Sequence, residues 1–188
     1  MRGRNPVSGE AQPESEQPVV DEIVAVYALD GRLTETAPRS VVRARNLRHA
    51  CVAVVVRNGS GEVYLHRRTE TKDVYPGHYD VMAGGVLQPG ETPMNAALRE
   101  VEEELGVTGV ALLPLGEAEY EDDVARYHAF GYLADYDGPI RWQPEEVAWG
   151  AWVALDELRA MIADPSRRFA PDTLALLEKW MPAVAASR

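Results

Sequence analysis

Residues 85–107 read GVLQPGETPMNAALREVEEELGV, and this stretch carries most of what the sequence says about fold and function. It predicts a helix with defined ends. Thr92 supplies a hydroxyl that can cap the first turn, and Pro93 suits the first helical position. Gly106 stands where a helix ends on a left-handed residue. We therefore expect a helix over residues 93–105, preceded by a glycine-rich loop.

Three glutamates share one face of this helix. At 100° per residue, Glu100, Glu103 and Glu104 fall within an arc of about 100°. These like charges repel one another and oppose the helix dipole, which destabilises the helix. A divalent cation such as Mg²⁺ would reverse that penalty, because it prefers clustered carboxylates as ligands. The alternative is a solvated acidic face. The apolar residues expected to anchor the helix lie on the flank of this face: Met94, Leu98, Val101 and Leu105.

The spacing of these residues resembles the Nudix box, the signature of the Nudix hydrolase superfamily. That pattern is a glycine, five residues, a glutamate, seven residues, and then Arg-Glu-apolar-any-Glu-Glu-any-Gly-apolar. Every defined position is filled: Gly85, Glu91, Arg99, Glu100, Val101, Glu103, Glu104, Gly106 and Val107. The resemblance implies an αβα sandwich. It also implies Mg²⁺- or Mn²⁺-dependent hydrolysis of a phosphoanhydride bond in a nucleoside diphosphate-linked or related substrate.

The same resemblance implies roles for individual residues. Arg99 and Glu91 are expected to pair and to hold the helix and its metal ligands in place. The implied metal ligands are the carboxylates of Glu100, Glu103 and Glu104 and the main-chain carbonyl of Gly85.

The sequence leaves the general base open. Glu103 and Glu104 are catalytic candidates, although a carboxylate bound to a metal is a poor base. Many members of the superfamily use a distant loop glutamate instead, and Glu146 lies in a suitable place just before a predicted strand. The further candidates are Glu145, Glu121 and Asp122, and for each the alternative is a simple surface charge.

A narrower resemblance covers residues 67–91, which look like the isopentenyl-diphosphate isomerase branch of the superfamily. It implies that Arg68 and Lys72 hold the substrate diphosphate. The isomerase activity does not carry over, because Gly84 and Val86 stand where that branch has its active-site cysteine and a metal-binding histidine.

Hydrolysis is therefore the leading hypothesis, and two others stay open. One is isomerase activity, for which only His49 matches an isomerase histidine in position. The other is a non-catalytic Nudix-like binding domain, which the intact glutamates argue against. The group attached to the diphosphate is not specified by the box. Aromatic residues that could stack on a base, or simply pack in the core, are Tyr75, Tyr79, Tyr127 and Trp142.

Composition limits the partners. The net charge of −11 argues against a general nucleic-acid backbone binder, so a small-molecule diphosphate is the expected partner. No apolar run reaches the length of a membrane span. The single cysteine, Cys51, excludes an intrachain disulfide and lies in the apolar run CVAVVV, so we expect a buried thiol and a cytoplasmic protein.

The order of the elements favours an α+β fold, a mixed sheet with helices packed on its faces. Residues 1–18 are polar and rich in Pro and Glu, which predicts a disordered tail before one Nudix-like domain over residues 19–188. Residues 40–45 fit a short strand or a turn of helix. Strands are expected over residues 23–27, 49–56, 62–68, 78–83, 110–117, 125–132 and 147–153, and further helices over 155–162 and 173–185.

Overall fold

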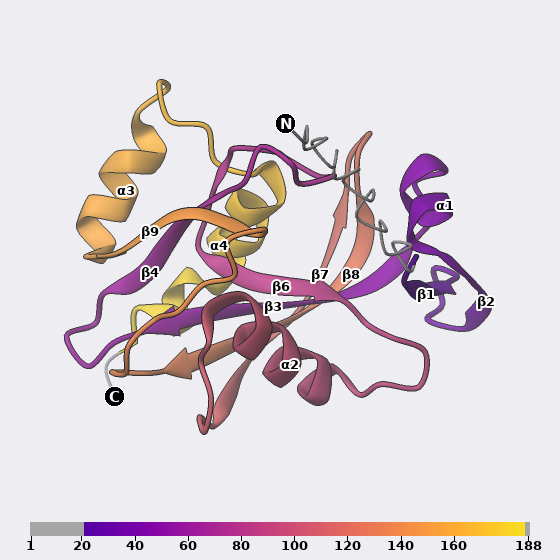
Figure 1. Cartoon of the computed structure of the whole chain (residues 1–188), viewed down its shortest axis with the longest axis horizontal. Coiled ribbons are helices and arrows are strands. Elements are labelled where there is room, and N and C mark those ends of the chain that lie inside the picture. Colours follow the sequence, from indigo (N-terminus) through magenta and orange to yellow (C-terminus); the bar gives the residue numbers. More distant parts are fainter. Residues whose placement is uncertain (1–20, 187–188) are drawn as a thin grey trace, which may run out of the picture.

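The computed structural model describes residues 21–186, so the predicted tail over residues 1–18 lies outside the described part. The fold is the predicted mixed β-sheet with helices on its faces (Figure 1). Its elements are β1 (Ile23–Tyr27), β2 (Leu33–Pro38), α1 (Arg39–Ala44), β3 (His49–Arg57), β4 (Val63–Arg68), β5 (Tyr79–Asp80), β6 (Met82–Val86), α2 (Pro93–Leu105), β7 (Leu112–Glu121), β8 (Arg126–Asp135), β9 (Val147–Val153), α3 (Leu155–Ala163) and α4 (Pro171–Val184).

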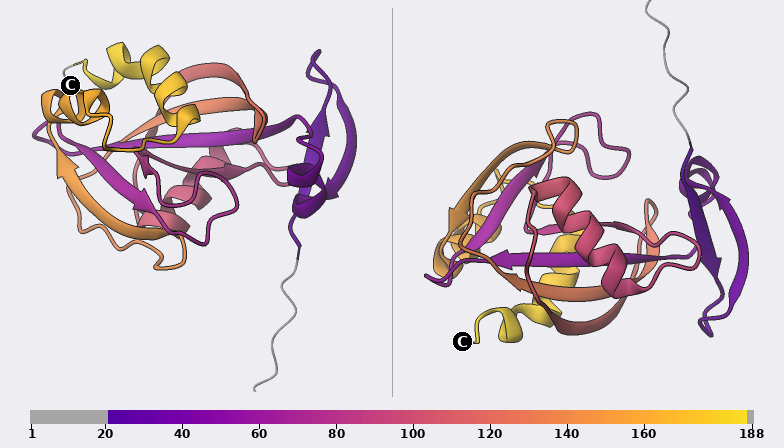
Figure 2. Two further views of the ribbon diagram at one scale, coloured as in Figure 1. Left: turned by 90° about the horizontal axis from the view of Figure 1, so that it is seen from above. Right: turned by 60° about the horizontal axis from the view of Figure 1, so that its bottom comes forward.

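Strand β3 lies at the centre of the sheet. It pairs with β8 in parallel along its whole length and with β6 in the antiparallel sense. All nine of its residues are buried, and they alternate between two cores because successive side chains of a strand point to opposite faces. Val55 packs in the core that includes Leu176 and Trp180 of α4, and Val54 packs in the core that includes Val101 of α2. Helices α2 and α4 therefore cover opposite faces of the sheet (Figure 2).

Strand β4 leaves β3 soon after their hairpin. Residues 58–61, with the sequence Asn-Gly-Ser-Gly, connect the two strands, which share a single pair in the ladder, Arg57↔Val63. From there β4 pairs with β9 and, near its end, with β5. The sheet thus opens between β3 and β4, and Arg68 at the end of β4 lies beside the opening.

Helix α2 packs on the sheet through small side chains. Its fully buried alanines allow a close approach, which turns the acidic edge of the helix toward the sheet. The expectation that Met94 and Leu98 anchor the helix is wrong, since they are 36% and 38% exposed. The buried residues of α2 are Ala96, Ala97, Val101, Glu104 and Leu105, of which Val101 and Leu105 were predicted. Each of these two larger apolar side chains stabilises the packing by roughly 1.5–3 kcal/mol.

Strands β1 and β2 and helix α1 form an arm at one end of the molecule (Figure 2). The sequence did not predict β2, because five of its six residues are exposed and no apolar alternation marks it. Residues 40–45, which the sequence left as a short strand or a turn of helix, lie mostly in helix α1, which spans Arg39–Ala44 and buries Val42. The arm brings Arg39 and Arg43 of this helix toward the body of the protein.

Several predicted bounds shift. The strand expected over residues 78–83 divides into β5 and β6, and β6 continues to Val86 because Gly84 lets the backbone lie close against β3. Strand β7, expected over residues 110–117, runs instead from Leu112 to Glu121. Helix α4 starts two residues earlier than predicted, at Pro171. Among the described helices, none combines the length and the apolar character that a membrane span requires.

Candidate active site

The ends of α2 are built as the sequence predicts. The Thr92 hydroxyl accepts a hydrogen bond from the Asn95 amide at 3.3 Å, and Pro93 is the first helical residue. Gly106 ends the helix with φ 68°, a left-handed conformation that glycine adopts at little cost. These two caps fix where the glutamates of the last turns stand.

Glu100 lies against the glycine pair of β6. A Cβ atom at Gly85 would lie 2.4 Å from Glu100 Oε1, so the carboxylate occupies space that only a glycine leaves. Burial raises the pKa of Glu100, and the neighbouring Arg99 guanidinium offsets part of that rise. Glu100 is thus a half-buried carboxylate held next to main chain.

Arg99 contacts three carboxylates. One belongs to Glu91, its expected partner, and the other two belong to Glu100 and Glu103. Its Nε and Nη2 donate to the two Glu91 oxygens, each at 3.0 Å. Its Nη1 lies 2.6 Å from Glu100 Oε1 and 3.3 Å from Glu103 Oε2. These contacts, with the Glu91 hydrogen bonds first, raise the pKa of Arg99. Because one nitrogen reaches both Glu100 and Glu103, the two carboxylates face a common point.

Glu104 turns the other way, into the protein. Its side chain is 6% exposed; Oε2 accepts from the Gly84 amide at 3.0 Å, and Oε1 lies 3.4 Å from His66 Nε2. Burial acts to raise the pKa of Glu104, but His66 and nearby cations lower it overall. Across residues 21–186, no three His, Cys, Asp or Glu side chains are grouped as a metal site would need. Glu100 and Glu103 are brought together, and Glu104 is not.

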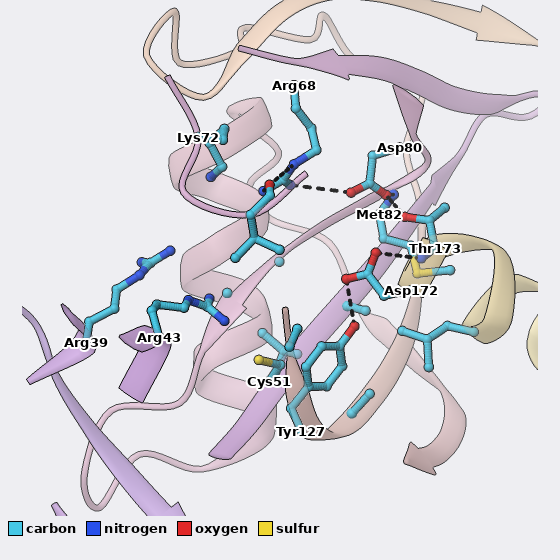
Figure 3. Close-up of a pocket in the computed structure, with 18 residues that line it drawn as sticks. Arg39, Arg43, Cys51, Arg68, Lys72, Asp80, Met82, Tyr127, Asp172 and Thr173 are labelled. Atoms are coloured by element: carbon cyan, nitrogen blue, oxygen red, sulfur yellow. Dashed lines mark hydrogen bonds and ion pairs between the residues drawn. The ribbon is translucent and has the colours of Figure 1, made fainter. Parts of the chain in front are cut away.

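A pocket opens beside the box and is lined by cations. Arg68 and Lys72, both predicted to bind substrate, line it together with Gly84 and Gly85. Figure 3 shows them with two further cations, Arg39 and Arg43 of α1. Across from Arg39 and Arg43 lie Tyr127, Asp172 and Thr173, and Asp80 lies next to Arg68.

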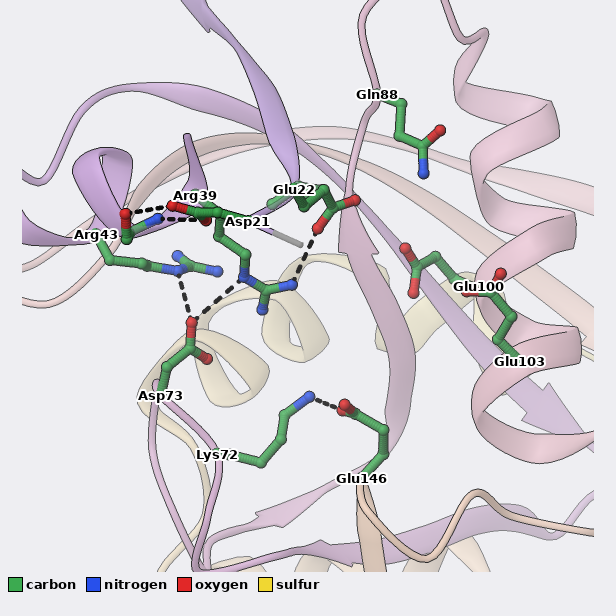
Figure 4. A network of polar contacts seen from close by, with 12 residues as sticks. Asp21, Glu22, Arg39, Arg43, Lys72, Asp73, Gln88, Glu100, Glu103 and Glu146 are labelled. Atoms are coloured by element: carbon green, nitrogen blue, oxygen red, sulfur yellow. Dashed lines mark hydrogen bonds and ion pairs between the residues drawn. The ribbon is translucent and has the colours of Figure 1, made fainter. Parts of the chain in front are cut away.

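Acidic partners hold the cations in place. Asp73 Oδ2 lies 3.4 Å from Arg39 Nε and 3.3 Å from Arg43 Nε, and Lys72 Nζ pairs with the Glu146 carboxylate (Figure 4). Burial acts to raise the pKa of Asp73, and the two arginines lower it overall. Figure 4 also shows Glu100 and Glu103 across from this group. One side of the site is therefore acidic and the other cationic.

Arg68 is anchored at the end of β4. Its Nε and Nη2 donate to the Val74 carbonyl at 3.2 and 3.0 Å, and its Nη1 lies 3.5 Å from Asp80 Oδ2. The loop that carries Lys72 is thus tied to the strand through a main-chain acceptor. Burial lowers the pKa of Lys72, and the positive charge of Arg68 adds to that effect.

The family model of the NUDIX domain matches residues 47–173, which include the box helix, the cationic loop and most of the pocket. The chain belongs to the Nudix family. It is 47% identical to an uncharacterized Nudix hydrolase of Rhodococcus erythropolis, orf19, over 85% of this chain and 92% of the relative. It is 36% identical to the uncharacterized Nudix hydrolase YfcD of Escherichia coli K12, over 85% and 87%. The crystal structure of DR0079 from Deinococcus radiodurans matches 85% of this chain and 99% of its own, with a TM-score of 0.72 and 25% identity.

Arg39 and Arg43 are candidate site residues of this Nudix domain that the sequence analysis missed. Their spacing of four residues places both on one face of a helix. That signal could have been used only if residues 39–44 had been assigned to a helix, and the sequence left residues 40–45 undecided.

The candidate general bases of the Nudix domain differ in the hydrogen bonds and ion pairs that their carboxylates make. The Asp122 carboxylate accepts hydrogen bonds from the Tyr75 and Tyr120 hydroxyls and from the Val124 and Ala125 amides. Burial acts to raise the pKa of Asp122, but these donors, Tyr75 first, lower it overall, which makes it a weak base. Two others lie away from the pocket residues: Glu121 pairs with Arg126 at 3.2 Å, and Glu145 is exposed. Only Glu146 contacts a cation of the pocket, Lys72.

Two positions bear on the isomerase reading of the Nudix domain. A Cβ atom at Gly84 would lie 2.1 Å from the Val52 carbonyl oxygen, so this backbone has no room for a cysteine there. His49 is buried in β3, and its Nδ1 lies 2.9 Å from the Leu47 carbonyl. Burial lowers the pKa of His49 to about 4, so the imidazole is neutral at physiological pH.

Two of the remaining candidate residues, Tyr127 and Cys51, line the pocket. Of the four aromatic residues considered for stacking, Tyr127 lines the pocket, and its hydroxyl donates to Asp172 Oδ2 at 2.8 Å. Tyr75 and Tyr79 pack against other rings, and Trp142 is 38% exposed. Cys51 lines the pocket as a buried thiol whose pKa burial raises to about 12, which makes it unreactive.

Replacing Gly85 by Ala is expected to lower the kcat/KM of a hydrolysis reaction at this site by about 10- to 100-fold while the protein stays folded. The new methyl group would displace the Glu100 carboxylate, which is the free end of a side chain and can move. Steady-state kinetics and a thermal melt of the variant check both parts. A variant with unchanged kcat/KM would show that the position of Glu100 does not matter.

Asp172 should make the stability of the protein depend on pH. Burial, followed by the negative charge of Asp80, raises the pKa of Asp172 from 3.8 to about 6. The folded state therefore binds this proton more tightly than the unfolded chain, and stability falls as pH rises through that window. Asp172→Asn should be more stable than wild type by up to about 3 kcal/mol at neutral pH, and the gain should vanish toward the unfolded pKa. Urea unfolding at several pH values measures the difference; a gain that does not depend on pH would contradict this account.

Proposed function

We propose that the protein is a divalent-cation-dependent hydrolase that cleaves a phosphoanhydride bond in a small diphosphate-linked substrate. The observation that carries this proposal is a cation-lined pocket next to the acidic face of α2. Gly85 lines the pocket and lies against the Glu100 carboxylate. Figure 4 shows Glu100 and Glu103 across from Lys72 and the α1 arginines. A diphosphate needs cations on its outer oxygens and oxygen ligands for a metal beside its bridging oxygen.

The cationic side would bind the diphosphate. Arg68 and Lys72 are fixed by main-chain and carboxylate partners, and Arg39 and Arg43 share Asp73. Phosphate oxygens can replace a carboxylate as the acceptor of these donors, because both offer charged oxygen atoms of similar geometry. The ion pairs present in the structure therefore keep the cations oriented for an anion.

The acidic side fits a hard divalent cation. Glu100 and Glu103 converge on one guanidinium nitrogen, and carboxylate oxygens are the ligands that Mg²⁺ and Mn²⁺ prefer. The expected ligands are these two carboxylates and the Gly85 carbonyl. Glu104 would join them only by leaving His66 and the Gly84 amide. When bound, the cation would neutralise phosphate oxygens and lower the pKa of the attacking water.

Glu146 is the general base that we favour. It pairs with Lys72, which lines the pocket, and it is not among the expected metal ligands. When a substrate phosphate replaces Glu146 as the partner of Lys72, the Glu146 carboxylate becomes free to accept a proton from water. Glu103, which is more exposed, is the alternative.

Two other readings remain distinct from this proposal. Residues 67–91 resemble the isopentenyl-diphosphate isomerases in the loop that carries Arg68 and Lys72, and we propose that these cations bind a diphosphate for hydrolysis. The protein lacks the active-site cysteine of the isomerases, because Gly84 stands at that position and this backbone has no room for a side chain there. A binding domain without catalysis would bind a diphosphate and leave it intact.

A substrate panel tests the proposal. The protein is given nucleoside di- and triphosphates, ADP-ribose, nucleoside diphosphate sugars, dinucleoside polyphosphates and isopentenyl diphosphate, each with Mg²⁺ or Mn²⁺. We expect at least one to be hydrolysed, and the activity to disappear with a chelator. Turnover of isopentenyl diphosphate without phosphate release would favour the isomerase. Binding of panel members with no hydrolysis of any would favour the non-catalytic domain.

A further inference from the structure

The pocket does not end at its cations. Beyond them it continues between β3, β8 and α4 to Asp172, whose carboxylate lies across from the arginines in Figure 3. The walls between are largely small or apolar side chains, among them Ala53, Met82, Ala129 and Leu176. A carboxylate is thus placed at the inner end of a pocket whose mouth is lined by ion-paired cations.

Asp172 has unused capacity to accept hydrogen bonds. Oδ2 accepts from the Tyr127 hydroxyl and Oδ1 from the Thr173 amide, both at 2.8 Å. An ionised carboxylate offers about four acceptor sites, so two remain. Among the described residues no cation pairs with it. An unpaired half-buried carboxylate beside a second one is unfavourable for stability, which is typical of a group retained for a ligand.

Asp80 is the contrasting case. Its Oδ1 accepts from the Thr173 hydroxyl at 2.6 Å and from the Met82 amide at 2.9 Å, and its Oδ2 faces Arg68 at 3.5 Å. Its partners account for its charge and its hydrogen bonds. Asp80 also links the two ends of the pocket, because it touches Arg68 on one side and the neighbour of Asp172 on the other. A group of a few atoms beyond the diphosphate would therefore span the distance from the cations to Asp172.

We propose that Asp172 selects the substrate by accepting a hydrogen bond from an amino or hydroxyl group carried by the moiety attached to the diphosphate. The diphosphate lies at the arginines and Lys72, the short linker passes the apolar walls, and the donor reaches the free oxygen sites of Asp172. Tyr127 orients that carboxylate. This inference rests on the proposed function, because it needs the diphosphate at the mouth of the pocket.

Three diphosphate esters of matched size test the inference: aminopropyl, hydroxypropyl and butyl diphosphate. They differ only in the terminal group, which is an ammonium, a hydroxyl or a methyl. Binding is measured by calorimetry with Ca²⁺ in place of Mg²⁺, so that turnover does not obscure it, and inorganic pyrophosphate serves as the common reference. We expect at least one donor-bearing ester to bind about tenfold or more tightly than the butyl ester. The stronger of the two identifies the donor.

The variant Asp172→Asn is expected to lose this preference and to bind the butyl ester as wild type does. The matched control is Asp156→Asn, which changes an exposed aspartate in the first turn of α3 and should keep the preference. Equal binding of all three esters by wild type, or an unchanged preference in Asp172→Asn, would overturn the inference while pyrophosphate binding upheld the diphosphate site. Failure of pyrophosphate and all esters to bind would overturn the proposed function and this inference together.

Discussion

Replacing Glu103 by Gln is expected to lower kcat/KM by about 10²- to 10⁴-fold without a measurable change in Tm. The variant keeps the shape of the side chain and removes the charge that a cation or a proton requires. Glu103 is 56% exposed, and it pairs with Arg99 Nη1 at 3.3 Å. A surface pair of this kind contributes only about 0–1 kcal/mol to stability. Steady-state kinetics on the best substrate of the panel measure the effect.

Glu102 provides the control for this variant. It lies next to Glu103 on the same helix and is exposed, but it points away from the acidic face. Glu102→Gln changes the net charge by the same amount and should keep full activity. If the two variants lost the same activity, the effect would be one of overall charge. If Glu103→Gln stayed fully active, the acidic face would have no catalytic role.

Replacing Gly84 by Ala is expected to destabilise the fold by about 3 kcal/mol or more, toward the upper end of what overpacking costs. The new Cβ would lie 2.1 Å from the Val52 carbonyl oxygen and 3.2 Å from the Ala53 Cα. Both are backbone atoms of β3, so relief requires β6 to separate from the central strand. The Gly84 amide would then also leave the Glu104 carboxylate. Chemical unfolding of the variant gives the free energy.

Gly85→Ala is the matched control, because the two glycines are adjacent in β6. There the nearest atoms belong to the Glu100 carboxylate, which can move, so activity should fall and stability should change little. Position 84 should affect folding, and position 85 should affect catalysis. Equal stability of the two variants would show that β3 and β6 are not packed as closely as this structure has them.

The sequence predicted the local features of the site and missed those set by distant packing. The ends of α2 follow from Thr92 and Gly106, which act within one turn of the chain. The Arg99–Glu91 pair follows from the box pattern. The direction in which the Glu104 side chain points depends on how α2 is rotated against the sheet. Two buried alanines, Ala96 and Ala97, set that rotation. A helical projection of the sequence does not contain this information.

The pocket itself is the product of long-range contacts. Asp172 meets Tyr127 from β8, 45 residues away, and Thr173 meets Asp80 from β5, 93 residues away. The helix predicted from the sequence began at residue 173, just after Asp172, and no pattern in the sequence marked Asp172 as a site residue. Arg39 lies on a helix of six residues that carries no apolar period. Such residues are found only when the topology brings them together.

Mn²⁺ binding followed by electron paramagnetic resonance tests most directly whether the acidic face of α2 holds a divalent cation. Free Mn²⁺ is titrated with wild type and with a double variant, Glu100→Gln and Glu103→Gln, and no substrate is needed. We expect wild type to remove Mn²⁺ from solution, and the double variant to bind it about tenfold or more weakly, because two charged oxygen ligands are lost. A wild-type protein that leaves Mn²⁺ free, or a double variant that binds it equally well, would contradict the assignment of this helix as the metal-binding side of the active site.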